Sequence, residues 1–400
     1  MNVTALLRRL WDRCRINGSV VVKVINFDNS ATSFPKPEGV RRAVSEVLLK
    51  KGGNPGRSGH RLSMDAAEII YRARSTAASF FGAETENTVF TSNCTHALNL
   101  AIKGAAPNGC HILISDLEHN SAARPVYALS KMGYSFDVFH IDDDWKTAES
   151  IERLVRPDTA MLICTLGSNV TGKIPPYKMI GEICRRRGMC FIADGAQASG
   201  AADIKLSDGI NILCTAGHKS LYGPTGTGLL LTDGTFGIKP LMEGGTGSSS
   251  LELEQPDFLP DGLESGTVNV CGIAGLEAGI RFVLSKGINA IRHHEETLCR
   301  RLINGLMKID GVTLYRGRGN YLPIVSFNID GYTSNEAAAA LNDRGFALRG
   351  GLHCAGLAHN ALGTAPEGTV RFSPSVFNSI SETDALICSI RALASMRSVQ

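Results

Sequence analysis

Short apolar runs alternate with helical patterns between about residue 26 and residue 250. The runs have the length of buried strands, and polar or glycine-rich stretches separate them. Continuous apolar strands separated by helices predict a sheet that helices cover on both faces. We therefore expect an α/β fold with a mostly parallel sheet. The expected strands lie at 88–91, 111–115, 160–164, 190–194 and 228–231, and the first of them precedes a helical pattern around residues 97–102.

The pattern changes after about residue 250. Loop-forming residues are dense at 244–250 and 255–260, where a helix or strand is not expected. One long helix over 273–303 then precedes strands near 313–315 and 324–327, a helix around 337–341 and a final helix near 383–396. This arrangement predicts a smaller α+β domain. The expected division is an N-terminal extension at 1–25, a large domain at 26–260 and a small C-terminal domain at 261–400.

The first 25 residues are basic and carry only short apolar stretches. They lack the longer apolar core and small-residue cleavage site of a signal peptide. We expect a loosely attached helix or an extension without a role in the fold. No apolar run in the chain approaches the ~20 residues that cross a bilayer, so we expect no membrane partner.

Composition narrows the class of protein. The 400 residues are 43% hydrophobic and 20% charged, with a net charge of +3, which is typical of a soluble globular protein. Both signs of charge are interspersed, so nucleic acid is not an expected partner. The 11 cysteines are scattered and never form Cys-x-x-Cys, which favours reduced thiols in a cytoplasmic protein.

Two polar positions follow the expected strands, where α/β sheets bind ligands. Asp194 ends one apolar run, and Lys219 lies among small residues without a neighbouring charge. Burial of such a lysine lowers the pKa of its amine and makes it nucleophilic. The glycine-rich stretch at 223–228 lacks the spacing of a Walker phosphate loop, so we reject a nucleotide site.

Pyridoxal phosphate needs a lysine for a Schiff base, a carboxylate for its pyridinium nitrogen, donors for its phosphate and a ring above its own. Lys219, Asp194, the strand-to-helix turn at 91–95 and His119 fit these roles. The turn suits a phosphate because the N-termini of helices bind anions. The sequence therefore predicts an enzyme that uses this cofactor.

Eight short segments occur in a fixed order from about residue 26 onward. They are Phe27-Asp28-Asn29-Ser30-Ala31-Thr32, Asn54-Pro55-Gly56-Arg57, Glu118-His119, Ser168-Asn169-Val170-Thr171-Gly172, Asp194-Gly195-Ala196-Gln197, Gly217-His218-Lys219, Tyr222-Gly223-Pro224-Thr225-Gly226 and Glu264-Ser265-Gly266-Thr267. Together these segments resemble the class V aminotransferase family, from about residue 26 to the end of the chain. The resemblance implies an aspartate-aminotransferase-type (fold type I) large domain, a smaller α+β domain and a homodimer with active sites at the subunit interface.

Within that family, residues 348–355 resemble the cysteine desulfurase and selenocysteine lyase branch, in its second group with Arg-x-Gly-x-x-Cys-Ala. The resemblance implies L-cysteine or L-selenocysteine as substrate and a possible sulfur-acceptor protein as partner. Cys354 would be the nucleophile, Lys219 and His119 the other catalytic residues, and Arg371 the anchor of the substrate carboxylate. Further implied cofactor contacts come from Cys94, Thr95, Thr215, His218, Gln197 and, across the dimer, Thr267, and further substrate contacts from Ala31, His60, Asn169 and Arg349.

Two positions depart from the family pattern. Ala216 stands where a hydroxyl residue usually precedes Gly-His-Lys, and Cys94-Thr95-His96 replaces the usual Thr-Thr-Glu of the phosphate turn. We expect Thr215, or His218 with backbone groups, to take over the first phosphate contact. Cys354 itself lies near Arg349 and His353 in a glycine-rich loop, a setting that suits a mobile nucleophile with a lowered pKa.

Other functions remain open on the sequence alone. A different class V reaction, such as transamination, epimerisation or β-elimination, would leave Cys354 without a catalytic role. A non-enzymatic scaffold would have no need of the set Lys219, Asp194, His119 and Arg371. A metal site is not expected, because residues 293–296 do not share a helix face and His353, Cys354 and His359 have no second ligand cluster.

Overall fold

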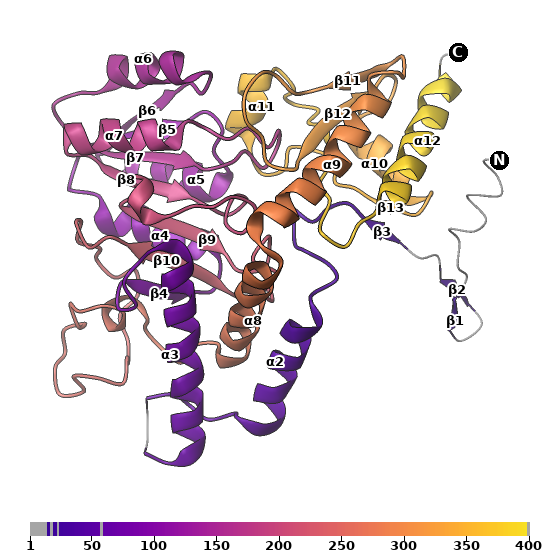
Figure 1. The fold of residues 1–400 in the computed structure, drawn as a ribbon. Coiled ribbons are helices and arrows are strands. Elements are labelled where there is room, and N and C mark those ends of the chain that lie inside the picture. The colour runs from indigo at the N-terminus through magenta and orange to yellow at the C-terminus, as the bar shows by residue number, and fades with distance from the viewer. Residues whose placement is uncertain (1–13, 17–18, 22–23, 57–58, 398–400) are drawn as a thin grey trace.

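A seven-stranded sheet forms the centre of the larger part of the molecule (Figure 1). The computed structural model describes residues 14–16, 19–21, 24–56 and 59–397. The sheet has the order β4-β10-β9-β8-β7-β5-β6, and all five predicted strands are confirmed. Its strands are β4 (Thr88–Thr91), β5 (His111–Ser115), β6 (Ser135–Phe139), β7 (Thr159–Thr165), β8 (Cys190–Asp194), β9 (Ile212–Ala216) and β10 (Gly228–Thr232).

Strand direction brings several strand ends to one edge of this sheet. Strands β6, β5, β7, β8 and β9 are parallel, which confirms the mostly parallel sheet. Strand β10 runs antiparallel to both β9 and β4. Gly228 pairs with Ala216 on one side and with Thr91 on the other, so the carboxyl ends of β9 and β4 lie at the same edge. The residues that follow these strands therefore meet there.

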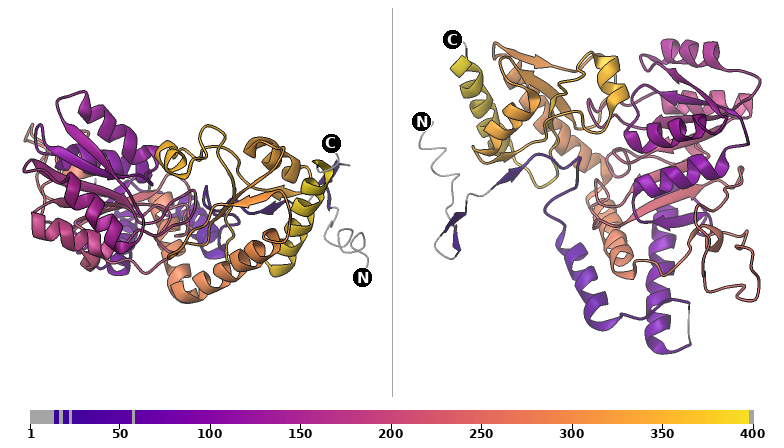
Figure 2. Two further views of the ribbon diagram at one scale, coloured as in Figure 1. Left: turned by 90° about the horizontal axis from the view of Figure 1, so that it is seen from above. Right: turned by 180° about the vertical axis from the view of Figure 1, so that it is seen from behind.

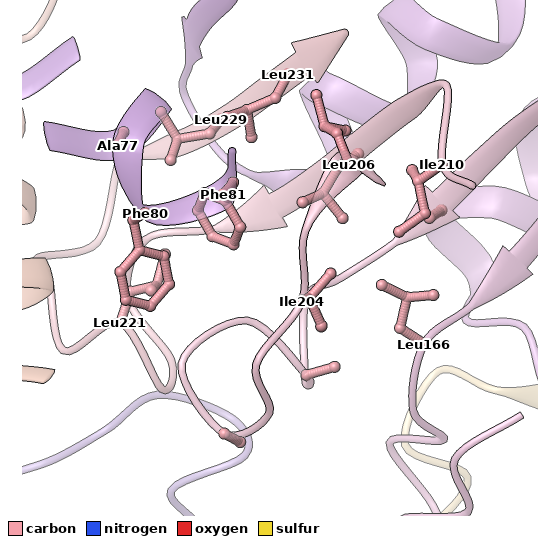
Figure 3. Packing of buried hydrophobic residues seen from close by; sticks show 14 of the residues in the cluster. Ala77, Phe80, Phe81, Leu166, Ile204, Leu206, Ile210, Leu221, Leu229 and Leu231 are labelled. Carbon is pink, nitrogen blue, oxygen red and sulfur yellow. The ribbon is translucent and has the colours of Figure 1, made fainter. Parts of the chain in front are cut away.

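Helices cover both faces of the sheet. Helices α4 (Cys94–Ala105) and α5 (Asn120–Ser130) pack on one face. The opposite face is covered by α3 (Arg61–Phe81), whose Ala77, Phe80 and Phe81 pack with Leu229 and Leu231 of β10 (Figure 3). The same side carries α2 (Glu38–Lys50), α6 (Asp144–Leu154), α7 (Tyr177–Arg187), α8 (Val270–Lys286) and the 3-10 turn η1 (Leu206–Asp208), while η2 (Asp261–Leu263) lies between β10 and α8 in the chain.

A second core lies beside the first in the orange and yellow part of the ribbon (Figures 1 and 2). It is built from Leu298 and residues after it, together with Phe27, which directly follows strand β3 (Ile25–Asn26). Strand β3 pairs in parallel with β13 (Phe346–Ala347). The antiparallel sheet of this core has the order β11-β12-β14. The elements are α9 (Ile288–Leu306), β11 (Val312–Leu314), β12 (Val325–Ile329), α10 (Ser334–Asn342), α11 (Gly356–Leu362), β14 (Val370–Phe372) and α12 (Ile380–Arg397).

The predicted single helix over 273–303 is wrong. Helix α8 ends at Lys286, and α9 begins at Ile288. Gly287 between them has φ +82°, a backbone conformation that only glycine adopts without strain. The break allows α8 to pack on the large core while α9 contributes to the second one.

The prediction for the N-terminal extension falls largely on residues 1–13, 17–18 and 22–23, which lie outside the described residues. The described part contains the antiparallel strands β1 (Cys14–Ile16) and β2 (Ser19–Val21). In the part of the chain that the structure describes, no helix is both long and apolar enough to cross a membrane.

Candidate active site

A cavity of about 220 Å³ lies at the carboxyl edge of the large sheet, where the second core meets it. Most of the predicted site residues line this cavity. They are Ala31, Cys94, Thr95, His119, Asn169, Asp194, Gln197, His218, Lys219, Arg349 and Arg371. The remaining four, Cys354, Thr215, Thr267 and His60, do not line it.

Lys219 and Asp194 provide an amine and a carboxylate in this cavity. Asp194 ends β8 and is 2% exposed, and Lys219 follows β9 in the neighbouring position of the sheet. Burial lowers the pKa of the Lys219 amine, and the charge of Asp194 partly opposes this effect. A lysine with a lowered pKa has a larger fraction of neutral, nucleophilic amine near neutral pH.

The carboxylate of Asp194 is held by two donors on one oxygen. The backbone N–H of Ala196 donates to Oδ1 at 2.8 Å, and the thiol of Cys94 donates to the same atom at 3.4 Å. Both contacts fix the orientation of the carboxylate toward the cavity. Gln197, in the loop after β8, donates from Nε2 to the carbonyl of Ser30 at 3.1 Å.

His119 precedes α5 and caps its N-terminus. The backbone N–H of Ser121 donates to Nδ1 of the ring at 3.1 Å. Burial lowers the pKa of His119, so the ring is neutral at neutral pH. Since Nδ1 accepts a hydrogen bond, the proton of the neutral ring lies on Nε2.

Arg371 is a buried cation in the wall of the cavity, 1% exposed. Its Nη2 donates to Oδ1 of Asp28 at 2.6 Å, and its Nη1 donates to the backbone carbonyl of Asn169 at 3.0 Å. Nε of Arg371 and Oδ1 of Asn169 have no hydrogen-bond partner among the described residues. Unpaired buried polar atoms are uncommon, and their position beside a cavity fits a polar ligand.

The turn before α4 has the geometry of an anion site. Asn93 caps the helix by accepting the N–H of His96 at 2.9 Å, while the N–H groups of residues 94 and 95 have no acceptor within the helix. The turn packs closely on β10, because a Cβ on Gly228 would come within 2.6 Å of the backbone of Asn93. Nδ1 of His218, also buried, has no partner among the described residues.

Cys354 lies on a loop at the rim of the cavity. Its side chain is exposed, whereas the nine other cysteines whose side chains the structure describes are buried or half-buried. Nη2 of Arg349 donates to Sγ of Cys354 at 3.8 Å. His353 and Cys354 have φ values of +49° and +57°, which are unusual for residues other than glycine.

Two hydrogen bonds tie this loop to the cavity wall. Nδ2 of Asn169 donates to the carbonyl of His353 at 2.8 Å. The N–H of Asn120, the residue after His119, donates to the carbonyl of Cys354 at 2.7 Å. The contacts hold the backbone in its strained conformation and place Cys354 near the residues that line the cavity.

Three predicted residues lie elsewhere. Thr215 projects from the other face of β9, where its hydroxyl donates to the carbonyl of Gly195 at 3.4 Å, so the cavity contains Ala216 in its place. His60 caps α3 by accepting the N–H of Ser63. Thr267 lines two other cavities of the chain. Arg74 and Gly266 also line the first of them, and Ser92 and Gly226 also line the second.

Two residues of the site were not assigned a role from the sequence. Asp28, the carboxylate partner of Arg371, lies in a matching segment but is 343 residues away from the arginine. Glu118 is fully buried beneath the site, where Oε1 accepts from the hydroxyl of Ser115 and from the N–H of Thr165, both at 2.5 Å. An acidic residue directly before the predicted His119 is the signal that could have identified it.

The site is rich in nitrogen and sulfur groups but shows no metal-binding arrangement. Within the described part of the chain, no group of three or more His, Cys, Asp or Glu side chains is placed to hold a metal ion. The rings of His353 and His359 lie 5.7 Å apart between centroids and are tilted by 35°, and burial lowers the pKa of His353 to about 2.

Comparisons with known proteins identify the family of the chain and proteins of similar sequence and fold. The model of the family described as aminotransferase class-V matches residues 25–386. A probable cysteine desulfurase of Methanothermobacter thermautotrophicus is 30% identical over 92% of this chain and 94% of its own. A probable cysteine desulfurase of Pyrococcus abyssi is 31% identical over 94% of this chain and 96% of its own. The solved apo structure of a cysteine desulfurase from Thermococcus onnurineus has a TM-score of 0.87 and 32% identity, covering 93% of this chain and 95% of that one.

Proposed function

Since the chain belongs to the class V aminotransferase family, we propose that it is a pyridoxal-phosphate-dependent cysteine desulfurase that converts L-cysteine to L-alanine. The sulfur passes to Cys354 as a persulfide. One observation carries this proposal beyond the family: an exposed cysteine is tethered at the rim of a cavity that contains a half-buried lysine and a buried carboxylate. Relatives and structural neighbours that cover most of the chain are named cysteine desulfurases.

The residues of the cavity fit the cofactor. When bound, pyridoxal phosphate supplies an electron-withdrawing pyridinium ring that acidifies the Cα–H bond of an attached amino acid. Lys219 would hold the aldehyde carbon of the cofactor and would then act on the proton at Cα of the substrate. Asp194 would accept the N–H of the ring nitrogen, and His119, with its proton on Nε2, would face the ring. The unpaired Nδ1 of His218, the turn at Thr95 and the open N–H groups there would hold the phosphate.

Arg371 binds the carboxylate of the substrate. Its guanidinium already has Asp28 as a partner, so it is held in place before a substrate arrives, and its unpaired Nε supplies a further donor. Asn169 adds a second donor, because its amide has one N–H beyond the one that it gives to His353. Together they orient Cα toward Lys219. The predicted contacts of Ala31, Gln197 and Arg349 belong to the same pocket wall.

Cys354 accepts the sulfur. Its thiolate attacks the substrate sulfur, an S–S bond forms as the Cβ–S bond breaks, and the electron pair remains on Cβ, which takes up a proton to become the methyl group of alanine. The net reaction, cysteine plus enzyme thiol giving alanine plus enzyme persulfide, balances without an external oxidant. Nη2 of Arg349, which donates to Sγ of Cys354, orients the attacking sulfur.

We further propose that the enzyme is a homodimer and that Thr267 reaches the phosphate bound by the partner subunit. Thr267 lies outside the cavity of its own chain. Large apolar side chains are exposed on α2, on α3 and in the segment before η2. Such exposure fits a surface that a second subunit covers. These side chains are Leu48, Leu49, Leu62, Met64, Tyr71, Leu251, Leu253 and Phe258.

The exposure of Cys354 allows a sulfur-acceptor protein to reach the persulfide directly. We place the enzyme in the cytoplasm, because the ten cysteines whose side chains are described are all unpaired thiols.

Purified protein supplied with pyridoxal phosphate and L-cysteine tests the proposal. We expect a visible absorbance band from the lysine-bound cofactor, and formation of alanine with sulfide in the presence of a thiol reductant. Cys354→Ala should keep the band and lose both products, with Cys388→Ala as a matched control because Cys388 is half-buried in α12. Unchanged turnover of Cys354→Ala would remove this residue from the mechanism, and keto-acid formation would indicate a transaminase instead.

A further inference from the structure

The side chain of Cys94 contacts Asp194, although its position in the chain suggests a contact with the phosphate. It is the first residue of α4, within the turn that the family pattern assigns to the phosphate. Its side chain is 7% exposed and points at the carboxylate of Asp194, with Sγ 3.4 Å from Oδ1. The thiol therefore lies at the end of the cavity that receives the ring nitrogen.

The thiol is poorly suited to accept sulfur. Burial raises the pKa of Cys94 well above its usual value, and the charge of Asp194 raises it further. The group is therefore a neutral S–H donor. Among the ten cysteines whose side chains are described, only Cys354 is exposed.

A thiol is a weaker hydrogen-bond donor than a hydroxyl. A strong donor to a carboxylate stabilises its charge and makes it less basic, whereas a weak donor leaves its basicity nearly intact. Oδ1 of Asp194 already accepts the N–H of Ala196 at 2.8 Å. A hydroxyl at position 94, as the family pattern has, would add a second strong donor to the same oxygen.

We propose that Cys94 is a positioning residue for Asp194, acting at the ring nitrogen of the cofactor and not at its phosphate. Its thiol orients the carboxylate while leaving it basic enough to keep the ring nitrogen protonated. The inference rests on the proposed use of pyridoxal phosphate but not on Cys354 or on sulfur chemistry. Thr95 and the helix N-terminus serve the phosphate without a side-chain contact from residue 94.

Cofactor analogues separate the two ends of the site. The dissociation constants of three probes are measured on the full chain freed of cofactor: pyridoxal phosphate, pyridoxal, and the deaza analogue of pyridoxal phosphate, in which C–H replaces the ring nitrogen. In Cys94→Ser we expect pyridoxal phosphate and pyridoxal to bind about 2- to 10-fold more weakly, the range of one hydrogen bond. The deaza analogue, which has no ring nitrogen to pair with Asp194, should bind as it does to the unaltered protein.

Two other patterns would overturn the inference. Equal weakening of all three probes would assign Cys94 to packing, and weakening that disappears with pyridoxal would assign it to the phosphate. Cys110→Ser is the matched control, because Cys110 is buried in the same core but does not line the cavity.

Cys94→Ala gives an independent measurement, including in the case that the serine variant does not fold. Removing the thiol takes away one of the two donors that orient the carboxylate of Asp194, so the affinity for pyridoxal phosphate relative to that for the deaza analogue should fall. An unchanged ratio would contradict the proposed positioning role. Failure of the unaltered protein to bind pyridoxal phosphate at all would refute the proposed function itself, whereas binding without desulfurase activity would leave the role of Cys94 intact.

Discussion

Replacing Glu118 with glutamine should change how the stability of the protein depends on pH. The carboxyl group is fully buried, and its Oε2 has no hydrogen-bond partner among the described residues. Burial, with a further contribution from the charge of Asp194, raises the pKa of Glu118 to about 8. At neutral pH the folded protein therefore contains a neutral carboxylic acid directly below His119. Glutamine keeps the oxygen that accepts from Ser115 and Thr165 and removes the titration.

The size of the effect follows from the shift. The pKa of Glu118 rises from 4.5 in the unfolded chain to about 8 in the folded protein. Below pH 4.5 both states hold the proton, and above that value only the unfolded chain releases it, so the free energy of unfolding falls as the pH rises through this window. One pKa unit corresponds to about 1.4 kcal/mol, so the full loss is about 5 kcal/mol and the loss between pH 5 and pH 8 is about 3.5 kcal/mol.

Urea unfolding of both proteins at pH 5, 6.5 and 8 measures this difference. We expect the free energy of unfolding of Glu118→Gln, relative to that of the unaltered protein, to rise by about 3.5 kcal/mol from pH 5 to pH 8. Glu149→Gln on the exposed side of α6 is the control and should show no such trend. A difference that stays constant with pH would show that Glu118 is already ionised in the folded protein, and the reasoning from burial would fail.

Three further predictions concern buried polar contacts. Arg74→Ala should lower the free energy of unfolding by about 3 to 5 kcal/mol in urea titrations, because the buried carboxylate of Glu264 loses the cation that pairs with it at 2.6 Å. A loss below about 1 kcal/mol would mean that the pair contributes little. Arg371→Ala should raise KM for L-cysteine at least ~30-fold in steady-state assays, the lower range for a buried charge contact, while the cofactor band persists; an unchanged KM would exclude it as the carboxylate anchor. Asn169→Ala should speed alkylation of Cys354 by iodoacetamide, since the loop loses one of its two tethers to the cavity wall; equal rates would show that this tether does not restrain the loop.

The strands and the convergence of polar residues could be predicted from the sequence because both depend on local information. A buried parallel strand is apolar throughout, and the direction of the chain then places Asp194, Lys219 and His119 at one edge of the sheet. The position of Gly287 also carried a local signal for the break between α8 and α9. The helical apolar pattern continues on both sides of this glycine, so the pattern alone favours one helix.

Contacts between distant parts of the chain could not be predicted in this way. The pairing of Asp28 with Arg371 depends on how two separate cores meet, and neither residue's neighbours in sequence indicate the other. The contrast between Thr215 and Ala216 depends on which face of β9 turns to the cavity. In a strand that is buried on both faces, apolar periodicity does not distinguish the two.

The pairing of β3 with β13 bears on the order in which the protein can form during synthesis. Phe27 and Asp28 leave the ribosome long before the strand and the arginine that they contact, β13 and Arg371. The large sheet has all its strands once β10 has emerged, whereas the cavity wall that holds Arg371 can form only after that arginine has emerged as well. A nascent chain stalled before residue 346 would therefore contain the lysine and its aspartate without the anchor for a substrate. Competence to bind the cofactor and competence to bind the amino acid would then arise at different times in the life of the same polypeptide.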